Sequence, residues 1–188
     1  PGPSVGKLVP KVRSTAKILY EIYSFLTIVL MILLVISGCP VFDSINLAFA
    51  TAGTGGFAVL NSSAADYNAA TQWILTIFMI LFGVNFNVYF LFYVKKWKDG
   101  LRCEEARAYL GIILGSVALI SFNIYHLVRN VELTVRQAAF QVASIITTTG
   151  FGSADFDQWP EFSKCILVLL MFIGACAGST GGGIKVSR

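Results

Sequence analysis

The chain has 188 residues, of which 56% are hydrophobic and 13% are charged, with a formal net charge of +4. Its mean hydropathy of +0.73 is too high for a soluble globular domain of this length, so the composition indicates a membrane protein. The four cysteines have no C-x-x-C spacing and no neighbouring histidines, which argues against a zinc site and against a disulfide framework.

The basic residues predict how the chain is oriented in a membrane. Eleven of the 14 lie before the first apolar stretch, between the two middle ones, or at the end of the chain. They are Lys7, Lys11, Arg13, Lys17, Lys95, Lys96, Lys98, Arg102, Arg107, Lys185 and Arg188. The positive-inside rule then puts both ends of the chain and the connection 95–107 in the cytoplasm. A basic connection can also bind nucleic acid, but its position between two apolar segments favours topology, and no nucleic-acid partner is expected.

Four apolar segments are expected to cross the bilayer, after an extended lead-in over residues 1–17. The first, Leu19–Ser37, would form a helix of about 28 Å, close to the roughly 30 Å of the hydrocarbon core. The others are Tyr67–Val94, Ala108–Val128 and Cys165–Ile184, and none of them contains a charged residue.

Two further amphipathic segments are too short to cross. Asp43 and Ser44 are candidate N-caps for a helix over Ile45–Thr51. Thr134–Gln137 fits a capping box and predicts a helix that begins there and ends near Thr147. Each helix would enter the membrane partway, and the chain would then return to the outer side as a re-entrant hairpin.

The two predicted hairpins carry the chemistry. Thr148-Thr149-Gly150-Phe151-Gly152 has the Thr-x-Gly-aromatic-Gly form of a potassium-channel filter. Irregular backbone at membrane depth is tolerated only where protein buries it or water reaches it, and its carbonyls can replace the hydration shell of a cation. The phenylalanines would wedge behind the hairpins and hold their width. The predicted ion-binding residues are Thr54, Gly55, Gly56, Phe57, Thr148, Thr149, Gly150 and Phe151.

The hairpins are related by an internal repeat. An offset of 94 residues aligns Phe57 with Phe151 and brings a span, a half-depth helix, a hairpin and a second span into register. The sequence therefore predicts an all-α membrane protein of two tandem span, pore helix, span repeats with re-entrant filter loops. These repeats are 18–94 and 108–188, joined by the cytoplasmic loop 95–107.

Other functions were weighed against this one. Asn85 and Asn87 fit a helix-to-helix hydrogen bond or the lining of an ion path. The final glycine run is not a phosphate-binding loop, because Ile184 separates Gly183 from Lys185 and an apolar span precedes it. No carboxylate pair, Cys/His set or Ser/His/Asp grouping occurs at catalytic spacing in the spans, so an enzyme is not expected.

Four motifs resemble one known family. They are Ala-Thr-Ala-Gly-Thr-Gly-Gly-Phe (50–57), Gly-Val-Asn-Phe-Asn (83–87), Thr-Thr-Thr-Gly-Phe (147–151) and Gly-Ala-Cys-Ala-Gly-Ser-Thr-Gly-Gly-Gly-Ile-Lys-Val (174–186). They are similar to the Trk/Ktr/HKT superfamily of cation transporters, and most similar to its bacterial TrkH branch. The resemblance implies four repeats in a complete polypeptide, of which this chain would be the second and third, with Gly56 and Gly150 as filter glycines.

The resemblance also implies potassium uptake as the function, with K⁺ as the transported ion and no organic cofactor. The last span would break into a glycine-rich intramembrane gating loop, formed by Gly174, Ala175, Gly178, Ser179, Thr180, Gly181, Gly182 and Gly183. The implied surroundings are a bacterial inner membrane, the other two repeats, a homodimer and a cytosolic nucleotide-binding ring of the TrkA/KtrA type. The alternatives are a sodium-permeable member of the superfamily and a membrane-embedded half that conducts nothing alone.

Overall fold

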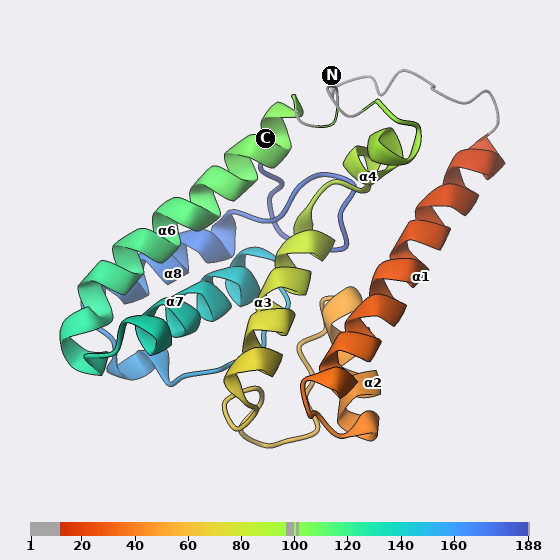
Figure 1. Cartoon of the computed structure of the whole chain (residues 1–188). Coiled ribbons are helices and arrows are strands. Elements are labelled where there is room, and N and C mark those ends of the chain that lie inside the picture. The colour runs from red at the N-terminus through yellow and green to blue at the C-terminus, as the bar shows by residue number, and fades with distance from the viewer. Residues whose placement is uncertain (1–11, 97–99, 101, 188) are drawn as a thin grey trace.

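Seven α-helices and one short 3-10 helix build the part of the chain described by the computed structural model, which covers residues 12–96, 100 and 102–187 (Figure 1). They are α1 (Val12–Ile36), α2 (Val41–Ala52), α3 (Ala69–Gly83), α4 (Phe86–Tyr93), α6 (Glu104–Val128), α7 (Val131–Ile146), η1 (Phe156–Gln158) and α8 (Glu161–Phe172). In these residues the only β pairing is an isolated bridge between Ile173 and Ile184. The predicted all-α class is confirmed.

The first repeat begins with a long helix and a short one, as predicted. α1 ends at Ile36, and the chain turns at Gly38, which has a φ of +91°. Most of the predicted lead-in lies outside the described residues, and residues 12–17 already belong to α1. The predicted N-caps of α2 are wrong, because the helix starts directly after Pro40 and places Asp43 and Ser44 within its first turn. Proline suits a helix start because its φ is fixed and it has no N–H to satisfy.

The predicted span Tyr67–Val94 is wrong as a single helix. α3 and α4 meet at an angle of 87°, with the break after Gly83. Asn85 starts α4, because its side-chain oxygen accepts a hydrogen bond from the N–H of Asn87 at 2.9 Å. The side chain of Asn85 is therefore a helix cap, a role for which Asn is well suited and which competes with continuing the helix.

The second repeat follows the same plan. α6 covers the predicted span Ala108–Val128 and extends it by one turn at the start. α7 ends at Ile146, as predicted, but it begins at Val131 and not at the capping box. Asn130 is the N-cap, since its side chain accepts from the N–H of Leu133 at 3.1 Å, and Thr134 instead donates to the Asn130 carbonyl.

The last predicted span is helical only in its first part. α8 ends at Phe172, just before the glycine run, and residues 173–187 are not helical. Glycine weakens a helix by roughly 1 kcal/mol per residue relative to alanine, so a run of them favours this end point.

The helices form two units that meet at α3 and α7. Within the first unit α1, α2 and α3 pack on one another, and within the second α6, α7 and α8 do the same (Figure 1). The buried faces of α2 and α7 carry small residues, which let the backbones approach closely. They include Ala48, Ala52, Ala138, Ala139 and Ala143.

Large apolar side chains cover the outside of the molecule. Phe25, Ile28 and Ile32 of α1 and Leu114 and Phe122 of α6 are all exposed. α1 and α6 are long and apolar enough to cross a membrane, and the bent pair α3 and α4 passes the same test as one broken span. In Figure 1 the beginning of α1, α4 and the beginning of α6 lie at one end of the molecule.

Candidate cation site

The two hairpins have the same backbone conformation, repeated at the offset of 94 residues. Thr54 has a φ of +50° and Thr148 a φ of +56°, and Gly56 and Gly150 have φ values of +67° and +92°. A left-handed conformation is unfavourable for a β-branched residue. Its occurrence at both threonines shows that the hairpins are the same structural unit.

The hydrogen bonds that end the two short helices repeat at the same offset. In α2 the N–H groups of Gly53, Thr54 and Gly55 donate to the carbonyls of Phe49, Thr51 and Ala50. In α7 the N–H groups of Thr147, Thr148 and Thr149 donate to Ala143, Ile145 and Ser144. The sequence repeat is therefore also a repeat in the structure.

The hairpins touch at Gly56. A Cβ placed on Gly56 would overlap with the carbonyl oxygen of Thr149 and lie 2.9 Å from the carbonyl carbon of Gly150. Only glycine fits this approach, both because of the contact and because of its positive φ. Gly56 and Gly150, which lie 94 positions apart in sequence, thus come together as the repeat predicts.

A further feature of the site is the set of carbonyls between the end of each short helix and its predicted filter glycine. Among the described residues, no hydrogen-bond donor reaches the carbonyl oxygens of Gly53–Gly56 or of Thr147–Gly150. Thr147 and Thr149 are buried, whereas Gly53, Gly55 and Gly150 are exposed. Two adjoining runs of unpaired carbonyls are the chemistry expected of a site that strips water from a cation.

The second hairpin is braced by its own side chains. The hydroxyls of Thr147 and Thr149 are 2.7 Å apart, and the Ser144 hydroxyl donates to the Phe151 carbonyl at 2.6 Å. Phe151 is 2% exposed and packs in the core of the first unit. Phe57 is 81% exposed and does not wedge behind its hairpin within this chain.

The glycine-rich segment lies directly against Thr54 and Thr148 of the two hairpins. The Thr54 hydroxyl donates to the Thr180 carbonyl at 3.2 Å, and the Thr148 hydroxyl accepts from the N–H of Gly182 at 2.7 Å. The segment is closed at its base, where the N–H of Gly174 donates to the Ile184 carbonyl at 2.7 Å. We call residues 174–183 the glycine loop.

The glycine loop also fills the break between α3 and α4. The N–H groups of Cys176 and Thr180 donate to the carbonyls of Gly83 and Phe82, and the N–H of Phe86 donates to the Gly178 carbonyl. These bonds satisfy backbone groups that the 87° bend releases, which explains why the span breaks here.

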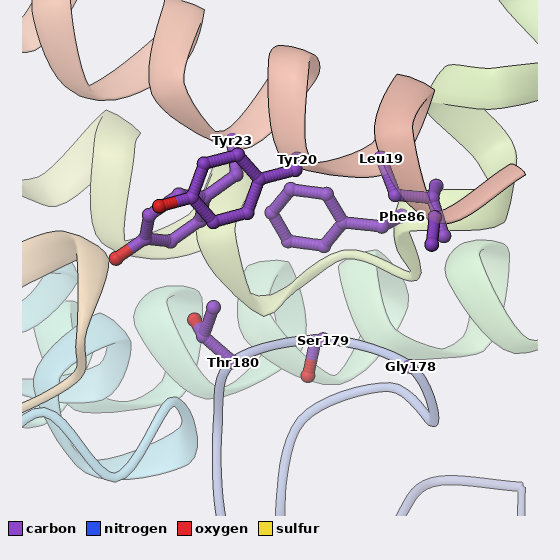
Figure 2. A pocket seen from close by; sticks show the side chains of 8 residues that line it. Leu19, Tyr20, Tyr23, Phe86, Gly178, Ser179 and Thr180 are labelled. Atoms are coloured by element: carbon purple, nitrogen blue, oxygen red, sulfur yellow. The ribbon is translucent and has the colours of Figure 1, made fainter. Parts of the chain in front are cut away.

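An apolar cavity of about 380 Å³ separates the tip of the glycine loop from α1. Figure 2 shows the aromatic rings of Tyr20, Tyr23 and Phe86 on one side of this cavity and the loop on the other. The ring of Tyr23 packs against Phe82 and Phe86, with centroids 5.8 and 6.3 Å away.

Acidic residues lie at the start of α2 and after the second hairpin. Asp43 is buried and accepts a hydrogen bond from the Tyr67 hydroxyl at 2.8 Å. Burial, followed by this hydrogen bond, raises the pKa of Tyr67, which keeps the hydroxyl a donor. Asp155 and Asp157 are exposed, and Asp155 accepts from the backbone of Asp157 at 3.2 Å.

Two side chains that hydrogen-bond to the second hairpin or to the glycine loop were not identified from the sequence. Ser144 is one, although its position opposite Ala50 in the repeat could have indicated a difference between the hairpins. Glu105 is the other, since its carboxylate accepts from the N–H of Ala177 at 2.6 Å. A pair of acids at a helix start gives no sign of such a distant contact. Among the described residues no group of three His, Cys, Asp or Glu side chains could hold a metal ion.

Comparisons with known proteins identify the family of this chain. The sequence model of the TrkH family, described as a cation transport protein, matches residues 4–188. The chain belongs to the TrkH family.

Relatives and a solved structure extend this finding. The TrkH-family chain is 37% identical to the Trk system potassium uptake protein TrkH of Salmonella typhimurium, aligned over all of this chain and 40% of that protein. Its identity to the TrkH protein of Escherichia coli is 36%, with the same coverage. The crystal structure of the potassium transporter TrkH from Vibrio parahaemolyticus superposes with a TM-score of 0.88 at 32% identity, over 97% of this chain and 40% of that one. The chain thus spans about 40% of the length of these relatives.

Proposed function

We propose that this chain forms half of the pore of a potassium uptake protein. The observation that carries the proposal is the pair of adjoining hairpins, with carbonyls that no described donor uses and a glycine contact that admits no side chain. Backbone oxygens without a fixed carboxylate suit a monovalent ion that must leave again quickly. The names of the relatives, which are potassium uptake proteins, support potassium as the ion.

The complete filter would be a ring of four hairpins, in which each repeat packs on its neighbour as the two repeats of this chain do. Phe151 of the second repeat is buried in the core of the first, and Gly56 of the first is pressed on the hairpin of the second. Continued round an axis, the same contacts would bury Phe57 in one further repeat and press Gly150 on the hairpin of another. The hairpins would then be re-entrant loops, and the repeats 18–94 and 108–188 would be two of four.

The glycine loop would be the gate of this pore. Its backbone is hydrogen-bonded to Thr54 and Thr148 beside the unpaired carbonyls, so an ion leaving the filter would meet it first. The loop contains Gly178 and Gly183 with φ values of +71° and +76°, which give it conformations open to few other residues.

The setting follows from charge and resemblance. The basic segments put both ends of the chain and the connection 95–107 in the cytoplasm, and the relatives are bacterial, so the inner membrane is the expected site. The expected partners are the remaining two repeats, a second copy of the transporter and a cytosolic nucleotide-binding ring of the TrkA/KtrA type.

Potassium uptake by the full-length protein that contains this chain tests the proposal. In cells without other potassium uptake systems, it should restore growth at low potassium, and Gly150→Ser should reduce discrimination against sodium. Gly115→Ser on α6, where a Cβ would meet nothing within 4 Å, is the matched control. No growth with the wild-type protein would contradict potassium uptake, and an unchanged selectivity in Gly150→Ser would remove this residue from the filter.

A further inference from the structure

Glu105 joins three segments that are far apart in the sequence. It lies in the first turn of α6, and its Oε1 atom accepts from the N–H of Ala177, 72 residues later, at 2.6 Å. Its Oε2 atom accepts from the Asn85 side-chain amide at 3.3 Å. One carboxylate therefore connects the start of α6 with the glycine loop and with the break between α3 and α4.

This geometry differs from that of an ordinary acidic residue at a helix start. Such a carboxylate normally pairs with the free N–H groups of its own helix. The neighbouring Glu104 is exposed and has no hydrogen bond with any described residue, whereas both oxygens of Glu105 bond to other segments. The two acids are of the same type and lie in the same turn of α6, but only Glu105 has these hydrogen bonds to other segments.

The contact falls at the point where the loop would have to move. Ala177 precedes Gly178, whose φ of +71° marks a sharp change of direction, and the Gly178 carbonyl accepts from the N–H of Phe86. Hydrogen bonds to a charged group are stronger than neutral ones, so the bond from Ala177 to Glu105 is the strongest single attachment at this end of the loop.

The loop has space to leave this position. A cavity of about 570 Å³ adjoins the carboxylate, between the start of α4, the start of α6 and residues 186–187, and its lining is mostly apolar. Its walls include Asn85, Asn87, Cys103, Glu105 and Val186.

We propose that Glu105 is the positioning residue that holds the glycine loop against the filter, and that breaking its bond to Ala177 releases the gate. The proposal rests on the function proposed above for the loop. The Glu105 carboxylate, which is not part of the filter, would then link the cytoplasmic end of α6 directly to the gate.

Ion flux through the full-length transporter, reconstituted in liposomes without any partner, gives the first test. Glu105→Ala should raise potassium flux about tenfold, because the loss of a charged hydrogen bond favours the released loop by about that factor. Glu105→Gln should raise it less, since its amide oxygen can still accept from Ala177. Glu104→Ala and Glu104→Gln should match the wild type, and the ratio of potassium to sodium flux should stay constant in all four variants.

Cys176 provides a second readout that does not depend on transport. This native thiol is fully buried beside Ala177, so it should react slowly with a small water-soluble maleimide. In the full-length protein with its other cysteines replaced, Glu105→Ala should speed the labelling of Cys176 several-fold, and Glu104→Ala should not. This measurement also decides the matter if Glu105→Ala lowers the yield of folded protein, because Glu105→Gln can then be compared with Glu104→Gln.

The outcomes separate the two proposals. Equal flux and equal labelling in Glu105→Ala and Glu104→Ala would overturn the role of Glu105, as would reduced flux with unchanged labelling. If neither the wild type nor Glu105→Ala passes potassium, the proposed pore function fails, while faster labelling in Glu105→Ala would still show that Glu105 holds the loop.

Discussion

The two hairpins share a backbone but not the side chains that support it. In the second hairpin, Ser144 and the pair Thr147 and Thr149 provide hydroxyl contacts, and Phe151 is buried. The first hairpin has Ala50, Gly53 and Gly55 at the matching positions, and Phe57 is exposed. Its contacts outside its own repeat include those of Gly56 with Thr149 and Gly150 and of Thr54 with Thr180.

The same hairpin conformation is therefore stabilised by different contacts in the two repeats. The second hairpin is held largely by its own repeat and by the core of the first unit, whereas the first depends on contact with its neighbours. The first hairpin should therefore be more sensitive to changes at the contact between repeats, and the second to changes in its own supporting side chains.

The largest expected effect comes from substitution of the glycine between the hairpins. Gly56→Ala should lower potassium uptake by the full-length protein to below about a tenth, because the left-handed backbone alone costs about 1–2 kcal/mol and the new methyl group overlaps with Thr149. Uptake of radioactive rubidium measures the loss, with Gly115→Ala as the control on an open helix surface. Normal uptake in Gly56→Ala would contradict the contact.

Gly150→Ala tests whether the second hairpin makes the same contact with a neighbour as the first. In this chain a Cβ at Gly150 would meet nothing within 4 Å, so only backbone strain opposes the change. In a ring of four hairpins Gly150 would touch the next hairpin, and Gly150→Ala should then be as damaging as Gly56→Ala. Uptake in Gly150→Ala well above that in Gly56→Ala would argue against equivalent contacts round the ring.

At the phenylalanines, the second hairpin should be more sensitive to substitution than the first. In this 188-residue chain, Phe151→Ala should lower the free energy of unfolding by about 3–5 kcal/mol, since it empties a buried site, while Phe57→Ala should change it by less than about 0.5 kcal/mol. Unfolding by denaturant in detergent measures both. Similar costs for the two substitutions would mean that the burial of Phe151 does not stabilise the chain.

The smallest expected effect concerns the hydrogen bond from the Ser144 hydroxyl to the Phe151 carbonyl. Ser144→Ala gives the second hairpin the residue found in the first and should cost about 1 kcal/mol, because the Phe151 carbonyl loses its donor. Ala50→Ser is the reciprocal variant and should not destabilise the chain. The same unfolding measurement applies, and a Ser144→Ala variant as stable as the wild type would show that the hydroxyl does not brace the hairpin.

The repeat was readable from the sequence because glycine and threonine spacing is a local property of the chain. The offset of 94 predicted which residues are equivalent, and the structure repeats their φ values and hydrogen bonds. The break after Gly83 was not readable, because its free carbonyls pair with a loop almost a hundred residues away. The helix starts at Pro40 and Asn130 were missed where several capping residues stood close together, and the sequence alone did not decide among them.

Anomalous diffraction from crystals of the full-length protein grown in rubidium tests the central claim most directly. The account predicts a rubidium peak within coordination distance of the carbonyl oxygens of Thr54–Gly56 and of Thr148–Gly150, which should weaken when sodium replaces rubidium. Rubidium bound elsewhere in the protein, with no peak between the two hairpins, would contradict it.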